Sequence, residues 1–353
     1  MLRVGLNSMA ENNAMRQLLD PNAYPYFLPH LNRQLEGVYL GSLKVAELSD
    51  AALAFSTSCD GRTAFRDFPD RDHGYEELGL LQDYILWLDE PLDAPTERQP
   101  GADTCLILSP HPHVGLLSMG GFMLNHRGLV DWTQAVCFSR VSATIFPEAF
   151  ATVQEVSAIR RDEASICSIL TGCRTEYFDL PAYELRKISA ADMFQRNEDD
   201  FRNLLKLDLY QLISDRKPLR VYAPAGIGEH PDHRLLFEIV LDFFKQDYFP
   251  KTEFHLYEDF PFAVSYLNVD DFLSGFESAC VDTESWNEDI SRVLESKCRL
   301  LDIFKSLFPE TDKQLVREVA RRNDLVGRNL SGSTPPGGAE RFWRLKDLNA
   351  ERS

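Results

Sequence analysis

The chain has 353 residues, of which 44% are hydrophobic, and its 37 basic and 55 acidic side chains give a formal net charge of −18. This length and hydrophobic content suffice for one large core or two smaller ones, and they exclude wholesale disorder. Because so acidic a surface repels phosphate backbones, nucleic acid is not expected as a partner. We expect a neutral or cationic small-molecule ligand, or one held by a few local arginines.

Export and membrane signals are not visible in the sequence. Residues 1–17 lack the apolar core of a signal peptide. No stretch approaches the ~20 uninterrupted apolar residues that a membrane span requires. The seven cysteines form no CxxC pair, so we expect reduced and mostly buried thiols. Together these features predict a cytoplasmic protein that contacts no membrane.

Residues 1–98 are expected to form an N-terminal extension. They run into DEPLDAPTERQPGAD, whose prolines and acidic residues are typical of a linker. Before it, ELSDAALAFSTSCDGRTAF has a short helical pattern followed by a turn at Asp60 and Gly61. That stretch resembles small winged-helix-like modules, and a helical extension packed on the main domain is the alternative. This region could also bind a protein partner.

From residue 99 to 275, short apolar runs alternate with longer helical periods. The runs predict buried strands at 105–109, 132–139, 175–180, 219–224 and 254–259. The apolar spacing predicts helices at 115–127, 148–171, 191–214 and around 236–243, and Gly172 is placed to end the second of these. This alternation is typical of a Rossmann-like α/β fold, a mostly parallel sheet with helices on both faces.

Residues 276–353 are predicted to form a C-terminal helical segment and a closing tail, both packed on the α/β domain. The apolar pattern favours a helix at 284–307. A capping box at Thr311 to Gln314 predicts the start of a second helix. The segment ERFWRL near the end is short and apolar, as expected of a closing tail.

Polar clusters follow two of the predicted strands. SPHPHVG, with His111 and His113, comes after the strand at 105–109, and GIGEHPDH, with His230, Asp232 and His233, comes after the strand at 219–224. Because ligands bind beyond the carboxyl ends of parallel strands, both loops belong on one edge of the sheet. A single histidine is usually structural, but this concentration predicts a metal or catalytic site. APAGIG lacks the GxGxxG pattern and a P-loop lysine, so no nucleotide cofactor is expected.

Both clusters resemble motifs of the LmbE/PIG-L family, zinc-dependent deacetylases of N-acetylglucosamine derivatives. PHPHVGLLSMGG is similar to the first family motif, which reads PHPDDE or SPHLDD before a helix with two glycines. VYAPAGIGEHPDH is similar to the second motif, HPDH or HxDH. Three further segments carry the resemblance: Arg160 to Glu163 with Gly172 behind them, YFDLPAYELR at 177–186, and YEDFPFA at 257–263.

The resemblance implies a zinc ion held by His, Asp and His, which activates a water for attack on an amide carbonyl. On this basis His111 and His233 occupy the first and last zinc-ligand positions. His230 stands where the family has an oxyanion-stabilising histidine, and Asp232 where an aspartate orients a neighbouring histidine. Arg160 stands where an arginine supports the substrate or the site.

The first motif departs from the family pattern at its most important positions. His113 stands where the family has the general-base aspartate, and Val114 stands where it has the zinc-ligand aspartate. Gly115 replaces the usual glutamate. A valine cannot ligate a metal, and zinc sites ordinarily keep three or four protein ligands. The resemblance therefore implies a degenerate metal site.

Three hypotheses follow and stay open. In the first, His111, His113 and His233 hold zinc, and the protein hydrolyses an N-acyl, amino-sugar-like substrate. In the second, no metal binds, and His113 is the acid/base of a repurposed biosynthetic enzyme, since an imidazole pKa near ~6.5 suits proton transfer. In the third, the domain is a pseudoenzyme that binds or scaffolds a partner.

Overall fold

The computed structural model describes residues 24–28, 31–34, 37–40, 43–46, 55–68, 85–88, 91, 100–150, 152–189, 198–228, 230–265, 282–308, 314–321, 323 and 337–346. The chain divides into two compact units, one of residues 1–95 with 144–163 and one of residues 96–143 with 164–353. Within the described ranges, no helix combines the length and the apolar character that crossing a membrane requires.

The N-terminal unit contains short antiparallel strands. Strand β1 (Tyr24–Phe27) pairs with β5 (Ile85–Leu88), and a separate meander is formed by β2 (Leu31–Gln34), β3 (Gly37–Leu40) and β4 (Leu43–Ala46). Of the short helix predicted ahead of the turn, residues 55–58 are helical, and the residues from 47 to 54 lie outside the described ranges. The winged-helix resemblance and the partner of this region stay predictions.

A cluster of aromatic side chains and a tight turn organise residues 55–68. Phe55, Phe65 and Phe68 are buried and meet edge to face, with centroids 5.1 to 6.2 Å apart. The Asp60 carboxylate accepts hydrogen bonds from the backbone of Arg62 and Thr63, both at 2.8 Å. Gly61 has a φ of 72°, a conformation that favours glycine. The predicted turn is therefore confirmed.

The second unit is built on one mixed sheet with the order β11-β12-β10-β9-β6-β7-β8. Its strands are β6 (Asp103–Ser109), β7 (Val130–Val136), β8 (Arg174–Tyr177), β9 (Arg220–Pro224), β10 (Glu253–Tyr257), β11 (Asp282–Asp289) and β12 (Ala339–Lys346). Strands β6 to β10 run parallel, whereas β12 is antiparallel to both of its neighbours. The predicted mostly parallel α/β sheet is confirmed.

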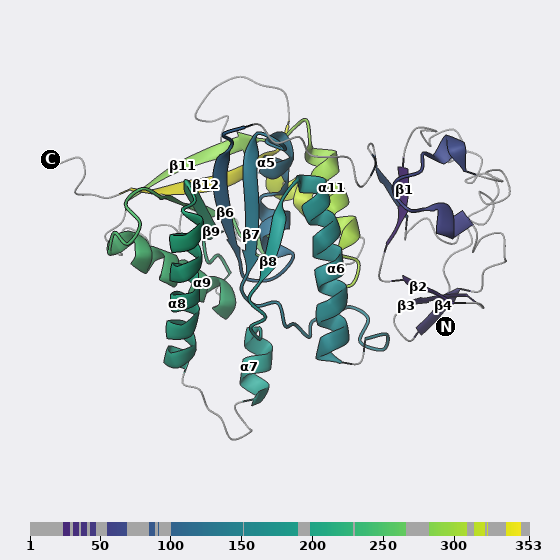
Figure 1. Cartoon of the computed structure of the whole chain (residues 1–353), viewed down its shortest axis with the longest axis horizontal. Helices are drawn as coiled ribbons and strands as arrows, with labels where there is room; N and C mark the ends of the chain where they lie inside the picture. Colours follow the sequence, from purple (N-terminus) through teal and green to yellow (C-terminus); the bar gives the residue numbers. More distant parts are fainter. Residues whose placement is uncertain are drawn as a thin grey trace. The chain divides into compact units, whose positions relative to one another are not determined.

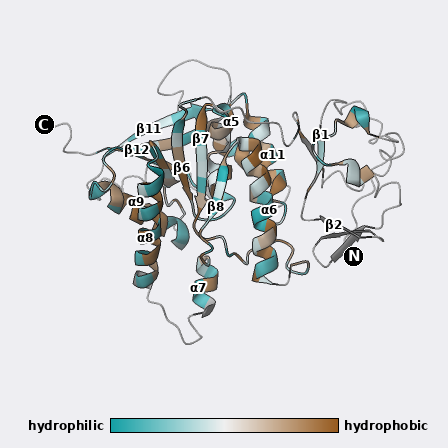
Figure 2. Ribbon diagram, in the orientation of Figure 1, coloured by the Kyte–Doolittle hydropathy of each residue, from teal (hydrophilic) through white to brown (hydrophobic). Residues whose placement is uncertain are grey.

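Helices cover both faces of this sheet (Figure 1). One layer contains α8 (Glu198–Arg216) and α9 (Pro231–Lys245), and the other contains α4 (Val114–Ser118), α5 (Gly120–Asn125) and α11 (Leu294–Ile303). The remaining helices are α6 (Val153–Thr171), which ends before Gly172 at a φ of 71°, and α7 (Tyr183–Ser189). Hydrophobic and hydrophilic residues alternate along α6 and α8 (Figure 2), as expected of helices with one buried side.

The helix predicted over 284–307 is wrong in its first half, because residues 282–289 form strand β11. The predicted closing tail is strand β12, which lies between β10 and β11. Trp286 of β11 stacks on Phe342 of β12, with centroids 5.0 Å apart, and its ring meets His255 of β10 at 5.2 Å. Such cross-strand contacts decide strand formation more than local pattern does.

A buried ion pair fixes helices α5 and α11 to the sheet. Glu340 of β12 accepts hydrogen bonds from the backbone N–H groups of Gly121 and Phe122 at 2.8 and 2.7 Å, at the start of α5. Its carboxylate also pairs with Lys297 of α11 at 2.5 Å, and both side chains are at most 7% exposed. A Cβ on Gly121 would lie 2.6 Å from Ile290, so the second glycine of SMGG is needed for close packing.

Glu340→Ala should therefore lower the free energy of unfolding by about 3–5 kcal/mol, because Lys297 keeps a buried charge without its partner. The double variant Lys297→Met/Glu340→Leu should recover most of that loss. Urea unfolding measures both effects. The control is Glu284→Ala, which removes an exposed ion pair with Lys346 and should cost at most about 1 kcal/mol. A Glu340→Ala variant as stable as this control would contradict the account.

Candidate active site

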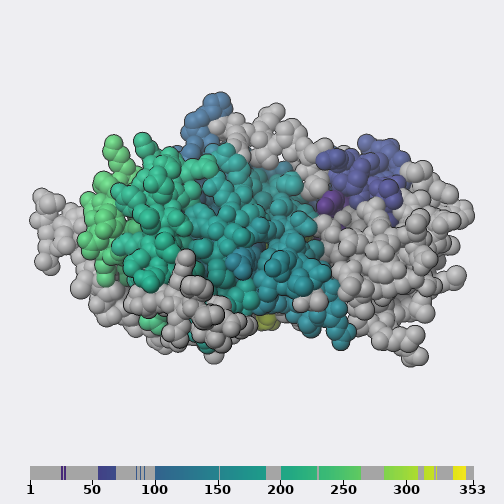
Figure 3. Space-filling model, turned by 60° about the horizontal axis from the view of Figure 1, so that its bottom comes forward, coloured from purple at the N-terminus to yellow at the C-terminus, as the bar shows by residue number. Residues whose placement is uncertain are grey.

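The site lies where two neighbouring strands end. Strands β6 and β9 run parallel and side by side, with Leu106 opposite Val221. The loop after β6 carries His111 and His113 into α4, and the loop after β9 carries His230 into α9. Figure 3 shows the teal and green segments of this unit as one continuous surface. Parallel pairing alone therefore brings the two histidine clusters to one edge.

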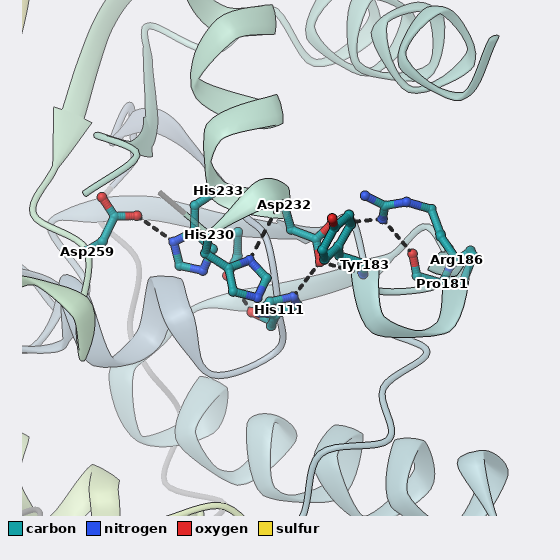
Figure 4. Close-up of polar contacts among 9 residues, drawn as sticks. His111, Pro181, Tyr183, Arg186, His230, Asp232, His233 and Asp259 are labelled. Carbon is teal, nitrogen blue, oxygen red and sulfur yellow. Dashed lines mark hydrogen bonds and ion pairs between the residues drawn. The ribbon is translucent and has the colours of Figure 1, made fainter. Parts of the chain in front are cut away.

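The predicted histidines His230 and His233 lie beside His111 (Figure 4). Its ring centroid is 5.1 Å from that of His230, 5.6 Å from that of His233 and 5.8 Å from that of His113. His230 and His233 are 5.1 Å apart. His113 also meets two apolar rings, Phe304 at 5.9 Å and Phe308 at 5.5 Å. The cluster is thus polar at its centre and aromatic on the side of His113.

Asp232 is the anion at the centre of this cluster. It is fully buried and contacts Nε2 of His111 at 2.9 Å, the guanidinium of Arg186 at 2.8 Å and the backbone N–H of Tyr183 at 3.0 Å. Burial alone would raise its pKa, but the hydrogen bond and charge of His111, the charge of Arg186 and the Tyr183 N–H outweigh burial and lower the pKa to about 2. Asp232 is therefore ionised at neutral pH.

His230 begins helix α9 and is held there by its own side chain. Its Nδ1 accepts a hydrogen bond from the backbone N–H of Asp232 at 3.3 Å, as an N-cap residue does. Burial, followed by the charges of His111 and His233, lowers the pKa of His230 to about 4. A neutral ring that accepts through Nδ1 carries its hydrogen on Nε2. His230 can therefore donate a hydrogen bond from Nε2.

His233 forms a second buried pair, with Asp259 just after β10. Nδ1 of His233 lies 2.6 Å from the Asp259 carboxylate, which also accepts the backbone N–H of Ile227 at 3.0 Å. Burial lowers the pKa of His233. Burial also raises the pKa of Asp259 to about 8, although the backbone N–H groups that donate to its carboxylate lower it. Burial thus shifts both pKa values towards the neutral forms of the two side chains. Nε2 of His233 is buried without a hydrogen-bond partner among the described residues.

The start of α4 is tightly packed around Val114 and Gly115. Val114 is 0% exposed. Ser109 donates its hydroxyl to the carbonyl of His111 at 2.6 Å and accepts the N–H of Gly115 at 2.9 Å. A Cβ on Gly115 would lie 2.5 Å from Oε1 of Gln134. The space that a larger side chain at 115 would need is therefore already filled.

Within the described ranges, the metal-capable side chains that converge are His111, His230 and Asp232, whose ligand atoms all lie within 4.8 Å of one another. His113 and His233 neighbour that group without belonging to it. The three-histidine ligand set of the first hypothesis, His111 with His113 and His233, stays a prediction.

Arg160 lies on α6, in the unit that contains residues 144–163, and is described with that unit. Its side chain is 1% exposed and pairs with Glu163 at 3.4 Å. Burial lowers the pKa of Arg160, while the charge of Glu163 opposes this shift. The catalytic role expected for Arg160 stays a prediction.

The fold and the strand-end site define an α/β protein with a histidine-rich site at the carboxyl ends of its parallel strands. Residues 106–244 match the family model PIG-L, described as GlcNAc-PI de-N-acetylase, so the chain contains a PIG-L family domain. No curated protein matches the sequence.

Two similar solved structures are a zinc-inhibited form of the teicoplanin deacetylase Orf2 and a deacetylase–teicoplanin complex. The first is 17% identical with a TM-score of 0.53, and the second is 16% identical with a TM-score of 0.52. Each alignment covers 69% of this chain and 98% of the other. At these identities the likeness shows a shared fold.

Arg186 and Asp259 have places in the site that the sequence reasoning did not assign. Both lie in segments that carry the family resemblance, YFDLPAYELR and YEDFPFA. The position of Asp259 was a usable signal, because it is the last residue of the strand predicted at 254–259. Arg186 had no comparable signal, because it reaches Asp232 from helix α7.

Gly115→Ala should destabilise the protein by about 1–3 kcal/mol, because the added methyl group overpacks the contact with Gln134. In an ordinary helix the same change stabilises. Gln134→Ala opens space for the added methyl group. Gly115→Ala should therefore cost less stability in the Gln134→Ala background than in the wild-type protein. Urea unfolding of the four proteins measures this coupling. Additive changes would show that the contact is not restrictive.

The acid dependence of stability should contain a contribution from Asp232. Because its folded pKa lies near 2, below the unfolded value of about 3.9, the ionised side chain contributes roughly 2 kcal/mol above pH 4. This contribution is lost as the pH falls towards 2. The difference in unfolding free energy between wild type and Asp232→Asn should therefore shrink between pH 4 and pH 2. A difference that stays constant across this range would contradict the assignment.

Proposed function

We propose that this protein is a zinc-dependent hydrolase that removes an acyl group from a small amino-sugar-like molecule. One observation carries the proposal. Nε2 of His233 is buried without a hydrogen-bond partner among the described residues, while Asp259 binds Nδ1 of the same ring. A carboxylate behind a histidine is the usual outer-shell arrangement of a metal ligand. The PIG-L domain and the deacetylase fold support the same class of reaction.

The donor chemistry of the cluster fits a zinc ion, which binds imidazole nitrogen readily. We propose His111, His113 and His233 as its ligands. The converging set of His111, His230 and Asp232 is less suitable, because Arg186 and Tyr183 already occupy the carboxylate of Asp232. In that set, Nδ1 of His230 also has to keep its helix-capping bond. The proposed set leaves these bonds intact, provided that the His113 ring turns towards the cluster.

Hydrolysis adds water across the amide and leaves a free amine and a carboxylate. Zinc at this site would supply a water whose pKa is lowered from ~15.7 towards ~7. Negative charge then develops on the carbonyl oxygen of the substrate. His230 is suited to stabilise that charge, because its neutral ring donates from Nε2 while Nδ1 stays fixed by the helix cap. Asp232 orients His111.

A second candidate function is binding without catalysis. The observation in its favour is the packing at the start of α4. Val114 is buried where the family motif has an anionic ligand, and Gly115 has no room for a longer side chain. A site that has lost its carboxylates could retain an amino-sugar-like ligand without hydrolysing it. A metal-free reaction with His113 as acid/base is the remaining alternative.

Zinc titration of the metal-free protein by calorimetry tests the proposed ligand set. Wild type should bind one zinc ion per chain, and His113→Ala or His233→Ala should weaken binding by at least about 10- to 100-fold. His230→Ala should still bind zinc. The reverse pattern would assign the metal to His111, His230 and Asp232. His126→Ala, which changes a histidine packed on Phe122, is the control and should behave as wild type.

Release of a free amine from N-acetylglucosamine derivatives tests the activity. The zinc-loaded protein should turn over at least one of them, and His230→Ala should lower kcat by about 100-fold or more, because an oxyanion donor is lost. The readout is amine formation followed over time. Binding of a derivative without zinc and without turnover would overturn the hydrolase and favour the binding protein. Turnover without zinc that His113→Ala abolishes would favour the metal-free enzyme.

A further inference from the structure

We infer that the ligand of this site carries an apolar acyl group longer than acetyl, and that Phe262 and Phe308 select it. This inference deepens the proposed function and, for its effect on turnover, rests on it. Both phenylalanines lie beyond residues 106–244, the part of the chain that matches the family model. The family match therefore does not account for them.

Two phenylalanine rings lie directly against the histidine cluster. Phe262 follows β10, and its ring centroid is 5.0 Å from that of His233 and 5.5 Å from that of His230. Phe308 follows α11 and meets His113 at 5.5 Å. Both phenylalanines are half-buried. A ligand that reaches these histidines can therefore also cover apolar ring surface.

Both rings are held in place by their surroundings. Phe262 lies against Gly228 in the loop after β9, where an added Cβ would be 2.6 Å from the Cβ of Phe262. The ring of Phe308 meets the buried ring of Phe260 at 6.1 Å, and its backbone N–H donates to the carbonyl of Phe304 at 3.0 Å. A surface that is ordered before binding loses little conformational entropy when a ligand covers it.

The polar contacts of the cluster lie on its other side. Figure 4 shows Tyr183 and Arg186 on the side of His111 that faces away from Asp259, and Phe262 follows Asp259 in the chain. The hydroxyl groups of a sugar need hydrogen-bond partners when they leave water, and a phenylalanine ring offers none. The acyl group is the apolar part of an N-acyl amino sugar, so it is the part that suits the two phenylalanines.

The position of the scissile carbonyl gives the same assignment. In the proposed reaction His230 stabilises the carbonyl oxygen, and Phe262 contacts both His230 and His233. The carbonyl carbon is bonded directly to the acyl chain, which therefore begins within reach of Phe262. The single methyl group of an acetyl substrate is too small to cover this ring and Phe308 together. A longer chain can cover both.

Calorimetry of the metal-free protein with N-octanoylglucosamine and N-acetylglucosamine tests this preference. Each methylene group that leaves water strengthens binding about fourfold. Wild type should therefore bind the octanoyl derivative at one site per chain and at least about 10-fold more tightly than the acetyl derivative. In turnover by the zinc-loaded protein, kcat/KM should show the same order.

Variants of the two phenylalanines should lower the ratio of the two affinities. Phe262→Ala and Phe308→Ala should each reduce it about 3- to 10-fold, and Phe308→Leu should retain most of it, because an apolar side chain remains. Phe244→Ala is the matched control. It removes a half-buried ring that packs on Phe254 near the other end of α9, and it should leave the ratio unchanged.

Three results would overturn the inference: equal affinity of wild type for the two derivatives, no binding of N-octanoylglucosamine, or variants that weaken both derivatives equally. The last result would place the sugar on the rings. Circular dichroism checks folding, and if an alanine variant does not fold, the wild-type ratio and Phe308→Leu decide. A clear octanoyl preference without amine release would count against the proposed hydrolase and leave the ligand class intact. Equal turnover of both derivatives would do the reverse.

Discussion

The buried carboxylate of Asp232 is the constraint on which the site depends. It joins segments that are far apart in the sequence, because His111 follows β6, Arg186 belongs to α7 and Asp232 itself opens α9. An anion without exposure to water is tolerated only when it is paired and fully hydrogen-bonded. The loops can therefore not move independently, since a shift of either one leaves a buried charge without a partner. The same bonds that stabilise this edge of the sheet also orient its histidines.

A second buried carboxylate, Asp259, also binds a histidine, but its pKa is shifted in the opposite direction. Asp232 has a guanidinium beside it and is ionised, whereas Asp259 has only backbone donors and His233, so that burial raises its pKa to about 8. Two aspartate–histidine pairs at one sheet edge thus have aspartate pKa values that are shifted in opposite directions. Pairs whose pKa values are shifted in opposite directions are typical of functional sites.

The strand-end clusters were predictable from the sequence because they depend on topology. Apolar runs identified β6 and β9, and parallel pairing brought His111 and His230 together whatever their separation along the chain. Asp259 could have been found, because it ends a predicted strand at the same edge, whereas Arg186 was not predictable as a site residue, since its role depends on side-chain reach from α7 to Asp232. Strand β11 was missed for a related reason. Its strand character comes from Trp286 packing across β12, which no local pattern contains.

Val114 and Gly115 are tightly packed at the two positions where the sequence resemblance predicts acidic side chains. The resemblance assigns their positions to acidic side chains, yet Val114 is fully buried and Gly115 backs onto Gln134 with no room for a Cβ. The start of α4 is therefore packed around a small residue at 115 and an apolar side chain at 114. An aspartate at 114 would enter an apolar space and need a compensating partner. The carboxylates that remain at this sheet edge, Asp232 and Asp259, each bind a histidine instead, so the imidazole rings of the cluster are held from behind by buried carboxylates.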